Sequence, residues 1–251
     1  MHHVRSEWDD RDSHFPNNVF DDLPVFRPRP AASSRTEPVT LPLTFPRRPR
    51  YALLLSGAIA LRTLAQPTLT NGDASPSPGE SYLCHTGEYI YPGFTWSGGD
   101  MDFTDFTQTG STTRLFVVPS STTYGSSFPF ATVAEVAALG AWGYYRTSAA
   151  GFEQLGLRTA VSSLICASGT NVVPYPISYE DQVYEDYSCS GLSGTTPFTR
   201  TGSDTVQADG YGDLITPYGT FTNVLRISIF NNYRDIGSNI DEEANVSSYL
   251  W

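Results

Sequence analysis

The chain has 251 residues, of which 39% are hydrophobic and 13% aromatic, and it carries a net charge of −11. The charge is uneven, because residues 66–251 hold six arginines against nineteen acidic residues, whereas residues 1–65 are slightly basic. A domain this acidic repels phosphate backbones, so we expect no nucleic-acid partner. The 21 glycines and 18 prolines, together with the many aromatic residues, are typical of an all-β chain.

The first 65 residues predict an export segment rather than part of the folded domain. Residues 1–46 are rich in charge, Pro and Ser and have no apolar period, which indicates a disordered or non-native upstream extension. Basic residues 47–50, an apolar run and a small-residue site then predict a signal-peptide helix within residues 47–65, cleaved before Gln66. The apolar run is short of the roughly twenty residues that span a membrane. Sec and twin-arginine export both stay open.

Residues 66–251 predict one secreted all-β domain. Short runs of β-branched and aromatic residues recur, with turn residues between them about every ten positions. This spacing favours a single antiparallel domain, either a β-sandwich or a half-barrel-like curved sheet. At most one short helix is expected, near residues 131–139, where alanines are frequent and Gly140 follows.

The clearest β-hairpin is expected within residues 212–230. Pro217, Tyr218 and Gly219 supply its turn, since Pro fixes φ and Gly can take a positive φ. The strand after the turn alternates in polarity, as a half-buried strand does. One face of that strand is expected to carry Phe221, Asn223, Leu225, Ile227 and Ile229.

The three cysteines, Cys84, Cys166 and Cys189, predict one disulfide and one free thiol in an exported protein. A bond between Cys166 and Cys189 would close a loop of about 24 residues, worth roughly 3 kcal/mol on the chain-entropy model. The spacing does not establish this pairing.

A metal site is expected at one place only. Asp100, Asp102 and Asp105 follow two glycines, and closely spaced oxygen ligands of this kind can hold calcium, the only cofactor that the sequence suggests. The segment lacks the twelve-residue loop pattern of a dedicated calcium site. Because Met101, Phe103 and Phe106 are interleaved with the acids, a strand or tight turn explains the segment equally well.

Catalytic residues are harder to find in residues 66–251. Their single histidine, His85, adjoins Cys84, and neighbours on a strand point to opposite faces, so a surface or turn histidine is expected. Acidic runs at 180–181, 185–186 and 241–243 could supply a carboxylate pair, but such runs are usually solvated. The aromatic residues at 142, 144, 145, 184 and 187 could stack on sugars, although filling the core is the favoured interpretation.

Several short motifs are shared with a known group of proteins. They are Gln66–Thr70, Thr95-Trp96 with Met101-Asp-Phe103, Val118–Tyr124, Tyr144–Thr147, Tyr175–Tyr179 and, most specific, Ala208–Gly212 leading into Thr216–Arg226. On these motifs most of residues 66–251 resembles the N-terminal region of large secreted Bacteroidota proteins that carry a type IX secretion sorting domain. The resemblance implies an uncharacterised extracellular β-domain without catalytic residues to transfer. Such proteins usually continue further, so we expect this chain to be truncated at its C-terminus.

Together these features predict a secreted or cell-surface protein without a membrane span after signal cleavage. We expect a non-enzymatic binding or structural module of a larger exported protein, with an extracellular glycan or a cell-surface protein as partner. The alternative is an extracellular hydrolase-related domain that uses acidic residues.

Overall fold

The computed structural model describes residues 66–88, 99–136 and 140–251. The predicted upstream extension and signal peptide lie outside these residues, as do Thr95, Trp96 and the end of the predicted helix. The described elements are β1 (Thr68–Leu69), α1 (Asn71–Ala74), β2 (Ser81–Glu88), β3 (Gly99–Asp102), β4 (Thr107–Val117), two 3₁₀ turns (Pro119–Ser121 and Gly125–Ser127), β5 (Val133–Val136), β6 (Trp142–Thr147), β7 (Gly151–Arg158), β8 (Ser162–Pro174), β9 (Ile177–Ser178), β10 (Gln182–Ser193), β11 (Thr196–Thr216), β12 (Gly219–Gly237) and β13 (Ile240–Leu250).

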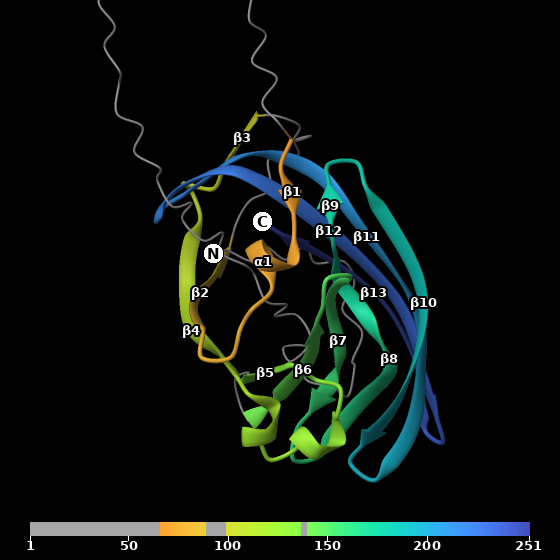
Figure 1. Cartoon of the computed structure of the whole chain (residues 1–251). Helices are drawn as coiled ribbons and strands as arrows, with labels where there is room; N and C mark the ends of the chain where they lie inside the picture. The colour runs from red at the N-terminus through yellow and green to blue at the C-terminus, as the bar shows by residue number, and fades with distance from the viewer. Residues whose placement is uncertain (1–65, 89–98, 137–139) are drawn as a thin grey trace, which may run out of the picture. The chain divides into compact units, whose positions relative to one another are not determined.

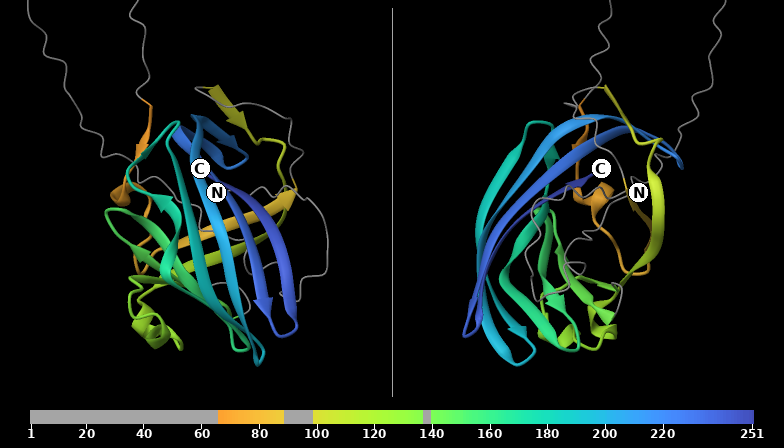
Figure 2. Two further views of the ribbon diagram at one scale, coloured as in Figure 1. Left: turned by 90° about the vertical axis from the view of Figure 1, so that its right-hand side faces the viewer. Right: turned by 180° about the vertical axis from the view of Figure 1, so that it is seen from behind.

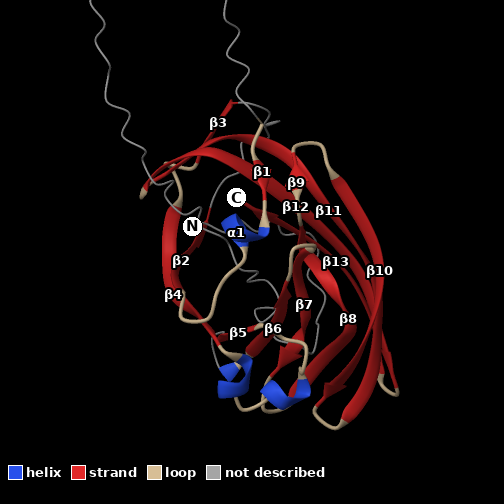
Figure 3. Ribbon diagram, in the orientation of Figure 1, coloured by secondary structure: helices blue, strands red, loops and turns tan. Residues whose placement is uncertain are grey.

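One sheet dominates the described residues, and it curls around its own core (Figure 1, Figure 2). Ten strands follow the order β13-β12-β11-β10-β8-β7-β6-β5-β4-β2, and β3 adds to β11 as an eleventh. Neighbours pair antiparallel except β3 and β11, which run parallel, and β1 pairs with β9 in a separate two-stranded sheet. The predicted all-β antiparallel domain is therefore confirmed, as a curved sheet (Figure 3).

The core lies on one face of this sheet, which we call the inner face and define by Val206, Ile227 and Ile229. Side chains from eight strands of the curled sheet meet there, because alternate residues of each strand point inward. Members from distant strands include Phe116 of β4 and Phe152 of β7, both fully buried. The curl thus lets one sheet cover its own apolar face.

The predicted helix near residues 131–139 is wrong in its described part. Val133–Val136 forms β5, which pairs with β4 on one side and β6 on the other. Two flanking strands satisfy its backbone groups, and this tertiary pairing outweighs the helix propensity of alanine. The one α-helix among the described residues lies instead at Asn71–Ala74, where the Asp73 carboxylate accepts hydrogen bonds from the backbone and hydroxyl of Thr70.

The predicted hairpin is present, and it is longer than expected. β11 and β12 are joined by Pro217 and Tyr218, and they pair along almost their whole length. The pairing register shifts between Gly212 and Leu214, opposite Asn223, whose φ is 57°. This bulge reverses the alternation, so the prediction that Phe221 shares a face with Leu225 is wrong. Phe221 packs with Leu214 and Val224 in a separate cluster.

The tip of this hairpin contacts strands near the opposite end of the sheet. The ring of Tyr218 stacks on His85 of β2, with centroids 4.2 Å apart and planes within 5°. Its hydroxyl donates a hydrogen bond to the side chain of Gln108 on β4. The tip therefore bridges from β12 to the far edge of the curled sheet.

No helix among the described residues has the length and apolarity needed to cross a membrane.

Candidate functional site

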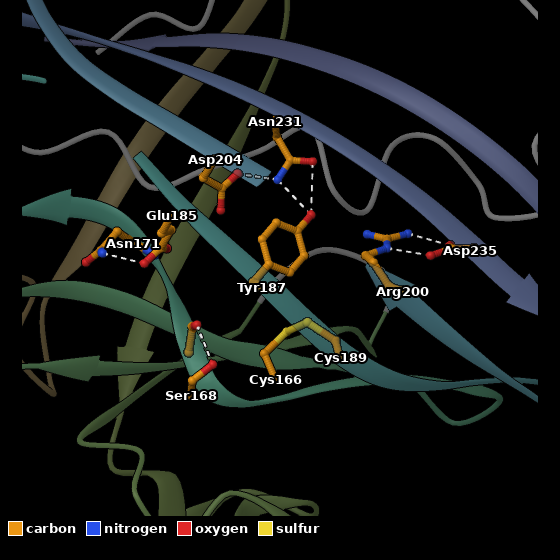
Figure 4. The surroundings of a disulfide bond; sticks show 11 residues. Cys166, Ser168, Asn171, Glu185, Tyr187, Cys189, Arg200, Asp204, Asn231 and Asp235 are labelled. Carbon is orange, nitrogen blue, oxygen red and sulfur yellow. Dashed lines mark hydrogen bonds and ion pairs between the residues drawn. A yellow bond between two sulfur atoms is a disulfide. The ribbon is translucent and has the colours of Figure 1, made fainter. Parts of the chain in front are cut away.

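A polar cluster interrupts the inner face beyond the apolar core. The antiparallel register places Glu185 of β10 opposite Asp204 of β11, and Asp204 opposite Asn231 of β12. Cross-strand partners share a face, so all three side chains point inward. Tyr187 lies two residues along β10 on the same face. We call Glu185, Tyr187, Asp204 and Asn231 the inner polar cluster (Figure 4).

Hydrogen bonds hold the cluster in place. The Asn231 amide donates to Asp204 Oδ1 and, at 2.9 Å, to the Tyr187 hydroxyl, which in turn lies 3.2 Å from Asn231 Oδ1. On the other side, Glu185 accepts from the backbone N–H of Asn171 and, at 2.7 Å, from its side-chain amide. Among the described residues, every donor to the two carboxylates is a neutral amide, so these contacts leave their negative charge uncompensated.

Burial changes the acidity of two residues in this cluster. Burial raises the pKa of Asp204 to about 6, against the hydrogen bond from Asn231, and the negative charge of Glu185 adds to the rise. Burial also raises the pKa of Tyr187 to about 12. At neutral pH the Asp204 carboxylate is therefore mostly ionised and lies beside a neutral phenol.

A fully paired charge lies nearby on the same two strands. Arg200 of β11 faces Asp235 of β12 and donates two hydrogen bonds to its carboxylate, of 2.8 and 2.7 Å. The guanidinium also lies over the ring of Tyr233, 3.6 Å from its centroid. Burial acts to lower the pKa of Arg200, but the Asp235 hydrogen bonds and neighbouring groups raise it above its usual value. The two charges of this pair therefore compensate each other.

The disulfide marks one border of the site. Cys166 of β8 and Cys189 of β10 are opposite each other and joined, and Cys189 is also opposite Arg200. β8 and β10 pair only from this bond toward residues 162 and 193. On the other side of the bond the strands separate, and the contact between Glu185 and Asn171 connects them. The disulfide thus fixes the point at which the sheet opens beside the cluster.

A second buried ion pair lies on β4 and β5. Arg114 and Glu135 are both buried and hydrogen-bonded, and the Tyr145 hydroxyl donates to Glu135 Oε2 at 3.0 Å. Burial and the neighbouring Glu135 charge raise the pKa of Tyr145 well above its usual value. Because the carboxylate is enclosed by its partners, this group resembles a structural ion pair rather than a binding site.

The residues predicted to bind calcium are not brought together. Asp100, Asp102 and Asp105 are exposed, and Asp102 Oδ1 accepts the backbone N–H of Thr104 at 2.8 Å. That hydrogen bond lowers the pKa of Asp102. Across the described part of the chain, no three His, Cys, Asp or Glu side chains are grouped so that they could hold a metal ion. Met101, Phe103 and Phe106 are instead buried in a cluster with β11 and β12.

The other predicted positions divide between core and surface. Tyr144, Tyr145 and Tyr187 are buried, whereas Tyr184 is 62% exposed, so the five aromatic residues form no common platform. In the acidic runs Asp181, Asp186, Asp241 and Glu243 are exposed, and Glu185 alone enters the cluster.

Sequence reasoning named Glu185 and Tyr187 but missed Asp204 and Asn231. Both lie in stretches that are polar on two faces, so no alternation marks which residues point inward. Asp204 lies in a Thr-rich stretch that predicts a strand, and Asp is depleted in strands. That unusual residue was the one available indication of a polar site. Its partners could not be found, since they depend on strand register.

No protein family, curated protein or solved structure matches this chain.

Proposed function

We propose that the chain is a non-enzymatic binding module of a larger secreted or cell-surface protein, and that its ligand is an extracellular glycan bound at the inner polar cluster. The observation that carries this proposal is the row Glu185, Asp204 and Asn231 across three strands. It offers many hydrogen-bond acceptors on a rigid surface. Sugar hydroxyls are donors that such oxygens can satisfy.

The position of the row supports binding rather than structure alone. Glu185 and Asn231 are each partly exposed, so the row is accessible from solvent. Its side chains are fixed by strand pairing and by hydrogen bonds to Asn171 and Tyr187. Preorganised groups of this kind lose little conformational freedom when a ligand binds.

A glycan array probed with the full chain tests the proposal. We expect binding to a defined class of glycans, and we expect Glu185→Gln with Asp204→Asn to abolish it. Asp186→Asn is the matched control, since it removes the same charge from the exposed face one residue away. An array without any signal, or signals that all three proteins share equally, would contradict the proposal.

A hydrolase-related domain is the second candidate, and one observation favours it. Asp204 and Glu185 differ in environment, with the pKa of Asp204 raised to about 6 by burial and Glu185 held by two amide donors. Two carboxyl groups, one of them with a raised pKa, are the usual acid and base of a glycosidase. Against it, the two lie side by side on adjacent strands rather than across a substrate. Release of reducing ends from a bound glycan, lost in Asp204→Asn, would favour this candidate.

A further inference from the structure

The charge of the inner polar cluster restricts the ligand more than its hydrogen bonds do. In the part of the chain that the structure describes, no arginine is paired with Glu185 or Asp204. Arg200, the nearest arginine along β11, donates two hydrogen bonds to Asp235. A buried carboxylate without a cation is costly unless something else neutralises it.

One oxygen of the cluster also lacks a donor. Asp204 is 4% exposed, and its Oδ1 accepts from Asn231. Among the described residues no group donates to Oδ2, which points away from Asn231 on the side where Glu185 and Tyr187 lie (Figure 4). Oδ2 is nevertheless not a buried atom, so it stays open to solvent. It is therefore an acceptor that a ligand's donor can reach.

We propose that the cluster binds the protonated primary amine of an amino sugar. The inference rests on the proposed function and specifies the ligand of the same site. An ammonium group carries three donors and a positive charge. Asp204 Oδ2 and the Glu185 carboxylate take two of these donors, and the Asn231 carbonyl or Tyr187 hydroxyl takes the third. The charge of the bound group compensates the acid that the protein leaves without a partner.

Two neighbouring features favour a sugar over other carriers of positive charge. Tyr233 lies on the same inner face as the carboxylates and is partly exposed, with Arg200 over one face of its ring. Aromatic rings offer the apolar contact that a sugar ring uses. Calcium needs six to eight oxygen ligands. Only two carboxylates contribute here, and the described residues hold no group of three that suits a metal.

Isothermal titration of the full chain at pH 6.5, where Asp204 is mostly ionised and a sugar amine is largely protonated, tests the inference. The probes are a glucosamine oligomer and the matched N-acetylglucosamine oligomer, in which an acetyl group removes the charge of the amine. We expect the free amine to bind, and acetylation to weaken binding roughly tenfold or more, because a charge-assisted hydrogen bond is lost. Asp204→Asn and Glu185→Gln should each weaken binding of the amine by a similar factor. Asp186→Asn, the exposed control, should bind like the original chain.

Other outcomes would refute the proposal that the ligand is a protonated amine. They are distinguishable from a failure of glycan binding itself. Equal affinity for the two oligomers, or binding only to neutral glycans on the array, would refute the amine but keep the proposed function. No binding to any glycan would remove both. Heat from calcium alone that Asp204→Asn abolishes, or binding of a lysine oligomer but not of glucosamine, would assign the cluster to a different ligand. Asp204→Asn is nearly isosteric, and thermal unfolding of each variant verifies that it is folded.

Discussion

Two rows of cross-strand partners on β11 and β12 each contain a buried aspartate, and the two aspartates have opposite charge environments. At one row Asp235 of β12 faces Arg200 of β11, and the two form a bidentate ion pair. At the other, four residues along, Asp204 faces Asn231 and has only a neutral donor. Strand geometry and inner-face position are the same in both rows. The difference is therefore chemical, because an arginine compensates the charge of one aspartate and no cation compensates the charge of the other.

This contrast separates charges that stabilise the fold from charges left for a ligand. A buried ion pair is weak evidence for stability, but the removal of one partner is strongly destabilising. An unbalanced acid behaves in the reverse way, because its neutralisation relieves a cost that folding imposed. The following predictions test that distinction, from the largest expected effect to the smallest.

Asp235→Ala should be the most damaging change. It leaves the buried Arg200 guanidinium without its carboxylate, so we expect a loss of about 3–5 kcal/mol in the free energy of unfolding. Chemical denaturation with urea measures it. Adding Arg200→Met to an apolar replacement of Asp235 should recover most of the loss. A single variant as stable as the original chain would show that the ion pair is not needed in this row.

Removal of the disulfide should have the next largest effect. Cys166→Ala with Cys189→Ala releases a loop whose ends are 23 residues apart, and we expect to lose roughly 3 kcal/mol of stability. The bond is opposite Arg200 and borders the point where β8 and β10 separate. Urea denaturation with and without reductant measures the loss. An unchanged midpoint for the reduced chain would contradict this prediction.

Asp204→Asn should increase stability, in contrast to the two preceding changes. The carboxyl titrates near 3.8 when unfolded and at about 6 in the native chain, so the native state binds this proton more tightly. The stability from protonated Asp204 is full below pH 4 and is lost as pH rises through 6. The Asn variant should therefore be more stable than the original above pH 6, by at most about 3 kcal/mol, and equal near pH 4. Urea midpoints of the two proteins measure this difference. If the midpoints of the original chain and the Asn variant differ by the same amount at pH 4 and above pH 6, the prediction is refuted.

Breaking the exposed pair of Arg234 and Asp241 should have the smallest effect on stability. Asp241 accepts two hydrogen bonds from Arg234, of 2.8 and 2.9 Å, and these lower the pKa of Asp241. Both side chains face solvent, where ion pairs contribute little. Asp241→Asn should leave the urea midpoint unchanged within error. A loss as large as that of Asp235→Ala would mean that burial is not what separates these pairs.

Sequence patterns predicted the strand content and the main hairpin because those depend on local signals. Pro217 and Gly219 mark the turn, and alternation marks the core residues Leu225, Ile227 and Ile229. Two errors came from tertiary pairing. Strand neighbours overrode the helix propensity around Ala134, and the bulge opposite Asn223 reversed the face of Phe221.

The candidate site was less predictable than the fold. Glu185 belongs to an acidic run that looks like a solvated face, and Asp204 belongs to a Thr-rich strand without an apolar side. What makes them a site is that Gln182 pairs with Gln207, which sets the register of the whole strand pair. A shift of one residue would turn Asp204 outward. That register follows from long-range packing, which a single sequence does not encode locally.

The hairpin tip has a consequence for the order of folding. Tyr218 is hydrogen-bonded to Gln108, 110 residues away, and stacks on His85, further still. Chains dominated by such distant contacts fold slowly, since long loops must close before the contacts can form. We expect the neighbouring hairpins to assemble early and the tip to engage last. Substitution of Tyr218 by Ala should then speed unfolding while hardly changing the rate of folding.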